Sequence, residues 1–285
     1  MYTCGTHRRY KRIKNIACGT FLCMNDLFLC VLKTMIIPAP FIVFSRKMST
    51  KPLVAAVSQD LFSTEDTIQQ AAYSGNLALV ELLRKKGATL VTKDLDGRTA
   101  LHWACCGGHA HLLRHFFTAN EEGVRSVLND KDEAGWTPLH SAVSSGHCEV
   151  VAILLEQGAD PNALTQQGRT SLHYLKGNSQ VAQLLVKHAS VDALNAKDEV
   201  GSTALCRAAT LGHVDVLSIL LNAGANINLA NTNGNTPLHL ACYEGIQNAA
   251  TLLLKAGASE DVVNKQGKRP VDLASGTFRS SLLEA

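Results

Sequence analysis

The sequence lacks the short motifs on which most enzyme classes depend. It contains no phosphate-binding Gly-x-x-x-x-Gly-Lys loop, no His-Glu-x-x-His pair and no Gly-x-Ser-x-Gly turn. Its nine cysteines include no Cys-x-x-Cys pair, which argues against a zinc ribbon and against a thioredoxin-like redox site. We therefore expect a protein that is not an enzyme and that uses no cofactor and no metal.

Positive charge is scarce outside the segment 1–47. This segment carries eight Lys or Arg against one acid, Asp26, and so contributes a net charge of +7. Of the 27 basic and 24 acidic side chains in the whole chain, 19 and 23 respectively fall in the segment 48–285, which has a net charge of −4. Because nucleic acid needs a basic surface, this mildly acidic body is not expected to bind it.

A long uninterrupted apolar run is also missing. The segment 1–47 has a basic start and an apolar stretch, but Asn25, Asp26, Lys33 and two prolines interrupt it, whereas a membrane span needs about 20 predominantly apolar residues. A targeting segment and a membrane anchor remain alternatives, and an upstream extension outside the fold is favoured. We expect a basic, apolar leader at 1–47, an N-terminal segment at 48–64 and one folded domain at 65–285.

Deleting residues 1–47 is expected to leave the thermal midpoint and the helical circular dichroism signal almost unchanged. A repeat array is stabilised by the cores of its own repeats and by the interfaces between neighbours, so a leader outside the array contributes little. Thermal denaturation of the full chain and of the shortened chain measures this. A large loss of either signal would mean that the leader packs on the array. In a separate test, EDTA is expected to leave the thermal midpoint of the chain unchanged, and a lower midpoint would indicate a bound metal.

What the chain has instead is an internal repeat. Segments related to "GWTPLHSAV" begin at six glycines, namely Gly97, Gly135, Gly168, Gly201, Gly234 and Gly267. Their sequence numbers differ by 38 at the first step and by 33 at each of the four later steps. A period of 33 with a Thr-Pro-Leu-His-x-Ala signature is typical of ankyrin repeats. A degenerate copy without the signature, "TIQQAAYSGNLALVELLRKKGA", precedes them. The sequence predicts an all-α ankyrin-repeat solenoid of about seven helix-turn-helix repeats joined by β-hairpin-like loops.

Each position of the repeat has a physical reason. Thr137 is predicted to cap the first helix, Pro138 fits the first helical position, and Gly146 ends that helix because it tolerates left-handed dihedral angles. The signature histidines are expected to bond between neighbouring repeats, since a catalytic pair would not be copied four times. They are His102, His140, His173 and His239.

Two repeats depart from the period. Five extra residues near "TANEEGVRSV" predict a longer exposed loop. The segment "LHYLKGNSQVAQLL" is three residues short between the signature and the second helix, and "SVDALNAKDEVG" regains three residues. The unchanged period therefore conceals a shortened helical hairpin around Lys176.

Function is expected on the concave face formed by hairpin tips and first helices. The residue after each loop glycine forms one column of side chains across the repeats, and the residue after each signature histidine or its substitute forms a second. Aromatic residues and arginines in these two columns are candidate hot spots for binding a protein partner. The candidates are Arg98, Trp103, Trp136, Arg169, Tyr174 and Arg207. Because Trp, Ser, Asn and Lys replace Arg98 in sister repeats, its position is interpreted as an exposed slot, and Arg98→Glu is predicted to fold and to weaken binding.

Several longer strings are more specific than the signature. "DLDGRTALHWAC", "NDKDEAGWTPLH" and "GNTPLHLACYE" resemble gankyrin-like proteins, the family of the proteasome non-ATPase regulatory subunit 10, over roughly residues 68–274. The resemblance implies a chaperone of regulatory-particle assembly that holds the C-terminal helical domain of a base AAA ATPase in its groove and hinders premature docking on the core particle. It further implies charged contacts at Asp94 or Asp96, Arg98, Asp132 and Lys176, and a monomer in the cytoplasm and nucleus.

An alternative partner class is suggested by "LACYE". Leu240, Cys242 and Glu244 fit Leu-x-Cys-x-Glu, a pattern by which some proteins engage the retinoblastoma protein. The same residues occupy a first helix of the repeat, where Cys242 should be buried, whereas the motif is usually bound as an extended strand. The alternative function is an ankyrin adaptor or inhibitor of cell-cycle proteins such as a cyclin-dependent kinase or the retinoblastoma protein.

Overall fold

The computed structural model describes residues 67–118 and 123–283. The leader predicted at 1–47 and the segment predicted at 48–64 lie outside these residues, as do the first two positions of the predicted domain 65–285. Every regular element in the described ranges is helical, which confirms the predicted all-α class. None of the described helices is long and apolar enough to span a membrane.

Consecutive helices form seven pairs in the described residues, each consisting of a first helix, a short connection and a second helix. The pairs are α3 (Ile68–Tyr73) with α4 (Leu77–Lys85), α5 (Ala100–Gly107) with α6 (Ala110–Thr118), α7 (Pro138–Ser145) with α8 (Cys148–Glu156), the 3-10 helix η2 (Ser171–Tyr174) with α9 (Ser179–Val186), α11 (Ala204–Leu211) with α12 (Val214–Asn222), α13 (Pro237–Tyr243) with α14 (Gln247–Lys255), and α15 (Pro270–Leu273) with α16 (Gly276–Leu283). The predicted number of repeats, about seven, is confirmed.

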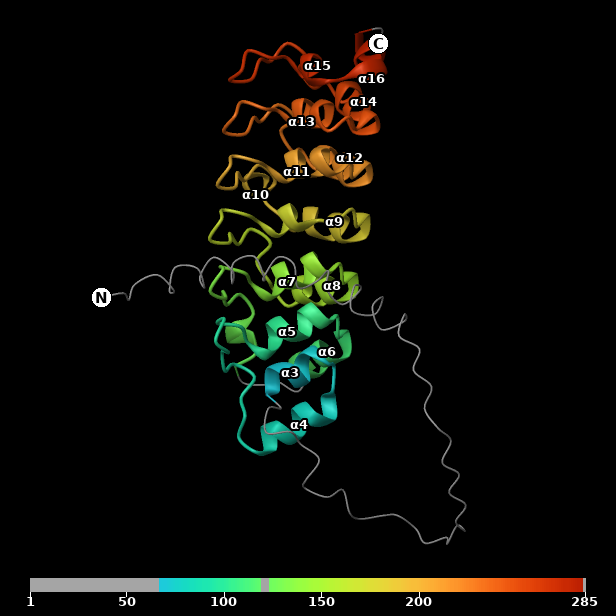
Figure 1. Cartoon of the computed structure of the whole chain (residues 1–285). Coiled ribbons are helices and arrows are strands. Elements are labelled where there is room, and N and C mark those ends of the chain that lie inside the picture. The colour runs from blue at the N-terminus through green and yellow to red at the C-terminus, as the bar shows by residue number, and fades with distance from the viewer. Residues whose placement is uncertain (1–66, 119–122, 284–285) are drawn as a thin grey trace, which may run out of the picture. The chain divides into compact units, whose positions relative to one another are not determined.

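Within residues 67–283 the pairs stack one on the next, as Figure 1 shows. First helices pack on first helices, in the order α3, α5, α7, η2, α11, α13 and α15. Second helices pack on second helices in the order α6, α8, α9, α12 and α14. The core runs continuously between the two columns and is filled mainly by Leu, Val and Ala. Each repeat therefore buries its apolar face against its neighbours, as the periodicity predicts.

The helix boundaries follow the predicted capping residues. Thr137 is the N-cap of α7 in extended conformation, Pro138 is its first residue, and Gly146 ends it at φ +79°. Left-handed dihedral angles of this kind favour glycine. The residues predicted to start and stop the helix of this repeat are confirmed.

The loops between repeats form a row on the far side of the first helices from the second helices (Figure 1). One backbone hydrogen bond joins each loop to the next: the N–H of Glu133 donates to the carbonyl of Asp96 at 2.9 Å, and the N–H of Gln166 donates to that of Ala134 at 3.1 Å. At Gly135 the loops approach so closely that a Cβ would lie 2.5 Å from the backbone nitrogen of Gln166. The spacing between neighbouring loops is therefore fixed by their backbones.

Residues 119–122 of the longer loop predicted in the second repeat lie outside the described residues, and the described part that follows differs from its predicted form. The sequence predicted an exposed loop, but residues 123–130 contain a turn of 3-10 helix, η1 (Arg125–Val127), and place three apolar side chains in the core. Val124, Val127 and Leu128 are each at most 5% exposed. Their i, i+3, i+4 spacing is the signal for one buried face that the loop interpretation overlooked.

The fourth repeat is shortened, and the structure locates the missing residues. The third repeat runs from its loop glycine, Gly135, to a second helix that begins at Cys148, whereas the fourth runs from Gly168 to a second helix that begins at Ser179, two positions sooner. The third missing residue is lost from the second helix itself, since α9 has eight residues and α8 has nine. A four-residue helix in the following connection, α10 (Val191–Leu194), restores the period. The first helix is reduced to one 3-10 turn, yet it still packs between α7 and α11.

Candidate protein-binding surface

The loops are held by a polar side chain that recurs at one position. The Oδ1 atom of Asp94 accepts the N–H groups of Asp96 and Arg98, and the Oδ1 atom of Asp132 accepts those of Ala134 and Trp136. Equivalent bonds are made in later loops by Asp198, Asn231 and Asn264, and Thr165 makes one of the two. These side chains shape the turns from which the candidate contact residues project.

Two arginines join one loop to the next. Nε of Arg98 donates to Oδ2 of Asp132 at 2.9 Å, and Nε of Arg169 donates to Oδ2 of Asp198 at 3.1 Å. Only 2% of the Asp132 side chain and none of the Asp198 side chain is exposed, against 18% of Arg98. The interpretation of Arg98 as an exposed, permissive slot is therefore wrong. Asp132 is already bonded within the chain, and a contact between it and a partner stays a prediction.

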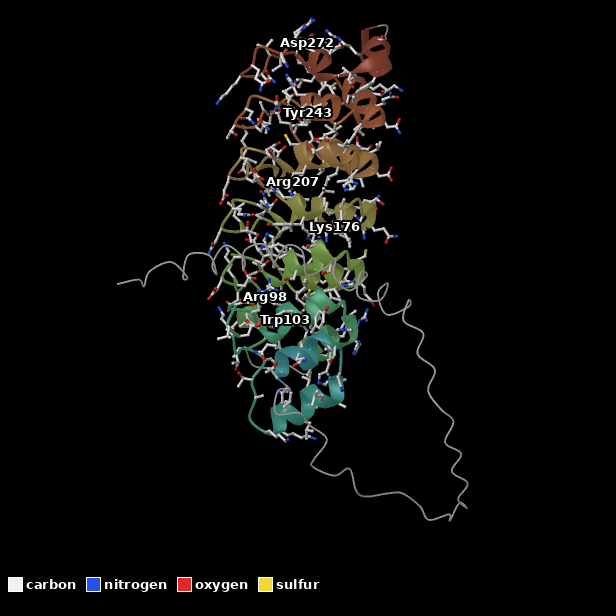
Figure 2. The ribbon with its side chains drawn as sticks, in the orientation of Figure 1. Arg98, Trp103, Lys176, Arg207, Tyr243 and Asp272 are labelled. Atoms are coloured by element: carbon white, nitrogen blue, oxygen red, sulfur yellow. The ribbon has the colours of Figure 1, made fainter. Side chains whose placement is uncertain are left out.

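Trp103 is fixed by contacts with three residues. Its Nε1 donates to Oδ2 of Asp94 at 2.7 Å, the guanidinium carbon of Arg98 lies 5.2 Å from the ring centroid, and Tyr73 packs edge-on at 5.7 Å between centroids. Figure 2 shows Arg98 and Trp103 together at the level of α5. The indole remains partly exposed, so it presents a rigid aromatic surface. Asp96, on the same loop as Asp94, is exposed.

A second aromatic group lies further along the array. Trp136 and Tyr174 pack with 4.5 Å between ring centroids, and both are partly exposed. Lys176, two residues after Tyr174, is exposed. Arg207 projects from α11, and 35% of its side chain is exposed. The structure thus brings Trp136 and Tyr174 together, and Arg207 lies next to them, since its Nε donates to the carbonyl of His173. Asp132 links this group to Arg98, because it accepts both the Nε–H of Arg98 and the N–H of Trp136.

The four signature histidines are structural in this fold. In each, Nδ1 accepts the N–H of the capping threonine, so the proton lies on Nε2, which donates to a carbonyl oxygen of the next repeat. For His140 the acceptor is the carbonyl of Arg169, at 3.3 Å, and for His102 it is that of Trp136, at 3.1 Å. Burial lowers the pKa of all four, to about 4 for His140. The predicted bond between neighbouring repeats is confirmed.

The Leu-x-Cys-x-Glu residues are helical. Leu240 and Cys242 lie within α13 and Glu244 is its C-cap, while only 1% of Cys242 is exposed. Burial also raises the pKa of the Cys242 thiol to about 12. Binding as an extended strand would require this part of the helix to open first.

Sequence reasoning missed three residues of this surface. Tyr73 braces Trp103, Asp198 receives both Arg169 and Arg207, and Tyr243 on α13 is 68% exposed. Tyr73 lies in the degenerate repeat, where no signature marks its position. Asp198 was detectable, because it stands four residues before Ser202 just as Asp132 stands four before Trp136.

The family comparison agrees with this geometry. A family model described as ankyrin repeats (3 copies) matches residues 68–165 and 172–266. The chain belongs to the ankyrin-repeat family. The ankyrin-repeat domain of human ASB11 superimposes with a TM-score of 0.64 at 26% sequence identity, over 77% of this chain and 97% of that domain. Ankyrin repeats are protein-binding modules, and the loops and first helices described above form one face of this one.

Two curated relatives of this ankyrin-repeat protein are proteasome subunits. It is 37% identical over 149 residues to the probable 26S proteasome regulatory subunit p28 of Saccharomyces cerevisiae, a match that covers 50% of this chain and 63% of the yeast protein. It is 39% identical over 97 residues to the 26S proteasome non-ATPase regulatory subunit 10 of Dictyostelium discoideum, covering 34% of this chain and 40% of that protein. Each match spans less than two thirds of the relative. The chain thus has homology to proteasome regulatory subunits over part of its length.

Proposed function

We propose that this ankyrin-repeat protein is a chaperone for assembly of the proteasome regulatory particle and that it holds the C-terminal helical domain of one base AAA ATPase subunit. Similarity to two proteasome regulatory subunits supports the proteasomal role. The protein acts as a monomer in the cytoplasm and nucleus and catalyses no reaction. Its contribution is to cover a surface of the ATPase subunit until assembly is ready for it.

The observation that carries the proposal is the pair of braced tryptophans. Trp103 is held by Asp94 and Arg98, and Trp136 is held against Tyr174, so neither indole needs to be ordered when a partner binds. Fixed aromatic side chains lose little conformational entropy on binding, and tryptophan is enriched among interface hot spots. Both indoles occur in the loops and first helices of neighbouring repeats, which suits one folded domain as the partner.

Affinity purification of the tagged full chain from a cell lysate tests the proposal. We expect free base ATPase subunits among the bound proteins and no core particle. Recovery of a cyclin-dependent kinase or the retinoblastoma protein without any base ATPase would support the cell-cycle alternative. Burial of Cys242 within α13 does not favour that alternative.

Trp103→Ala and Trp136→Ala are each expected to weaken binding of the ATPase domain by about 2 kcal/mol or more, because truncating a central aromatic residue typically costs that much. This corresponds to a rise in Kd of about 30-fold. Isothermal titration calorimetry with the purified C-terminal domain measures it. Circular dichroism of each variant checks that the helices remain.

Two further variants make this result specific. Trp103→Phe keeps one aromatic ring but loses the second ring and the Nε1 bond to Asp94, so it is expected to retain more affinity than Trp103→Ala. Lys255→Ala, on an exposed position of the second-helix column, is expected to bind like wild type. If both tryptophan-to-alanine variants bind like wild type while Arg207→Ala does not, the contact lies on later repeats than proposed.

A further inference from the structure

Two arginines converge on one carboxylate at the boundary of the fourth and fifth repeats. Nε of Arg169 donates to Oδ2 of Asp198 at 3.1 Å, and an Nη of Arg207 lies 3.6 Å from the same oxygen. The other oxygen of Asp198 accepts the N–H groups of Val200 and Ser202. The carboxylate is fully buried and its position is therefore fixed by four groups of the chain.

The charges in this cluster do not balance. Guanidinium groups stay protonated at neutral pH, so Arg169, Arg207 and Asp198 together carry one excess positive charge. Arg98 and Asp132, in contrast, form a pair of one arginine and one carboxylate. Burial, followed by the charge of Arg169, lowers the pKa of Arg207 below its usual range, while Asp198 and Tyr174 oppose that shift. A further negative charge beside Arg207 would be favourable.

Donors remain on both guanidinium groups. Within the described residues, Arg169 uses Nε, and Arg207 uses Nε for the carbonyl of His173 at 3.0 Å and one Nη for Asp198. A guanidinium has five N–H donors, and its two Nη groups match the spacing of carboxylate oxygens. Since 22% of Arg169 and 35% of Arg207 are exposed, a ligand can approach from solvent. Figure 2 shows Arg207 at the level of α11, on the first-helix column.

Apolar surface lies next to these donors. Trp136 packs on Tyr174, and Tyr174 directly follows His173, whose carbonyl oxygen accepts the Nε–H of Arg207. Exposed Lys176 follows Tyr174 by two residues and adds a further positive charge. The site therefore offers a fixed pair of cations beside an aromatic face.

We propose that the Arg169–Arg207 pair is an anchor for a carboxylate of the protein partner, an Asp or Glu side chain followed by an apolar residue that contacts Trp136 and Tyr174. The proposal rests on the proposed function only in taking this face as the one that binds a protein. It adds to the proposed function the chemical group of the partner that this part of the face recognises, a carboxylate beside an apolar side chain. The anchor is electrostatic, and its two arginines are held in advance by Asp198, so ordering them costs little when the carboxylate arrives.

The anchor is tested directly with two short peptides, Ac-Leu-Glu-Glu-Phe-NH2 and its Gln-Gln counterpart. The chain has two tryptophans, so their indole N–H signals in 15N NMR spectra are assigned with single Trp→Phe variants. We expect the acidic peptide to shift the Trp136 indole signal and the Arg207 Nε–H signal, with a Kd at least tenfold lower than that of the amide peptide. The Trp103 indole serves as the internal control and should not move. Equal shifts from both peptides would overturn the proposal.

Inorganic phosphate is the third probe. If phosphate moves the same two signals with a lower Kd than the acidic peptide, the pair is a phosphate site and the carboxylate assignment is wrong. Arg207→Gln should abolish the difference between the two peptides, and Arg207→Lys should restore part of it because it returns the charge without the planar fork. Asp198 keeps Arg169 in both variants, and thermal denaturation confirms that each remains folded.

Titration of the ATPase C-terminal domain then separates this proposal from the proposed function. If wild type binds and Arg207→Gln raises the Kd by tenfold or more, both are supported. If wild type binds and Arg207→Gln binds equally well, the anchor is wrong and the chaperone proposal stands. If wild type does not bind any base ATPase domain, the chaperone proposal fails, and the peptide titrations decide on the anchor by themselves.

Discussion

Replacing Arg98 by Glu is expected to lower the free energy of unfolding by about 3–5 kcal/mol, the usual range when a buried ion pair loses one partner. The change removes the Nε–H of Arg98 that donates to Asp132. It also places a second carboxylate beside that of Asp132, whose side chain is only 2% exposed. Two carboxylates in one buried site cannot both ionise without cost. Urea denaturation followed by circular dichroism measures the loss.

Matched variants exist at equivalent positions of other loops. Lys268 also follows a loop glycine, but its side chain is exposed. Lys268→Glu should therefore change the free energy of unfolding little. Arg169→Glu should cost less than Arg98→Glu, because Arg207 still lies 3.6 Å from Asp198. Adding Asp132→Asn to Arg98→Glu should recover part of the loss, since Nδ2 of an asparagine can donate to the new carboxylate. If Arg98→Glu unfolds at the same urea concentration as wild type, the Arg98–Asp132 ion pair contributes nothing to stability.

This expectation reverses the one drawn from sequence. If position 98 were an exposed slot that accepts many residues, the Arg98→Glu variant would fold normally and bind less tightly. Because Arg98 forms an ion pair with Asp132, we expect a less stable protein instead. Reduced binding by that variant would then report unfolding as well as a lost contact. Arg207→Gln is the better probe of the surface, because Asp198 retains a second arginine.

Lowering the pH from 7.5 to 5 is expected to destabilise the array by at least about 2 kcal/mol. The pKa of His140 is lowered by burial from 6.5 to about 4, so at pH 5 the unfolded chain binds a proton that the folded chain does not. At 1.36 kcal/mol per pH unit, His140 alone accounts for about 2 kcal/mol between pH 6.5 and pH 5. The lowered pKa of His102, His173 and His239 acts in the same direction.

The direction of the pKa shift determines the pH range over which stability is lost. A histidine with a depressed pKa contributes its full stability above pH 6.5 and loses it as the pH falls toward its folded value. Urea denaturation at pH 7.5, 6.5, 5.5 and 5 should therefore show a flat region followed by a decline. His140→Cys copies the fifth repeat, where Cys206 occupies the histidine slot, and should show a shallower decline. Equal stability at pH 7.5 and pH 5 in wild type would mean that the buried rings accept protons without unfolding.

The repeat made most of the fold predictable, because capping threonines and loop glycines set the backbone of their own copy, and signature histidines bond to a backbone carbonyl of the next copy that every residue type supplies. Pairing between copies was harder to predict. Arg98 and Asp132 are 34 residues apart, and a comparison of columns shows which side chains are interchangeable but not which neighbour each one contacts. For the same reason Trp103 and Trp136 could be placed on one face from sequence, while the bracing by Asp94 and Tyr174 could not.

The two departures from the period illustrate a second limit. Counting residues showed that the fourth repeat was short, but not that its first helix would become one 3-10 turn or that α10 would form in the connection. In the second repeat, buried Val127 and Leu128 show that residues in a segment predicted as an exposed loop can enter the core when their spacing permits it. Length alone does not distinguish a loop from a packed insertion.

The loop-to-loop bonds bear on how such an array gains and loses copies. A unit cut from one loop glycine to the next contains both members of a side-chain pair: 97–134 holds Arg98 and Asp132, 168–200 holds Arg169 and Asp198, and 234–266 holds Asn235 and Asn264. Bonds from a signature histidine to the following unit end on backbone carbonyls, which every residue type supplies. Duplication or loss of a whole unit therefore leaves these donors with their acceptors. Arg207 and Asp198 are different, as are Trp103 and Asp94, because each pair consists of side chains from separate units. The contact within each of these pairs depends on the order in which the two copies were inherited.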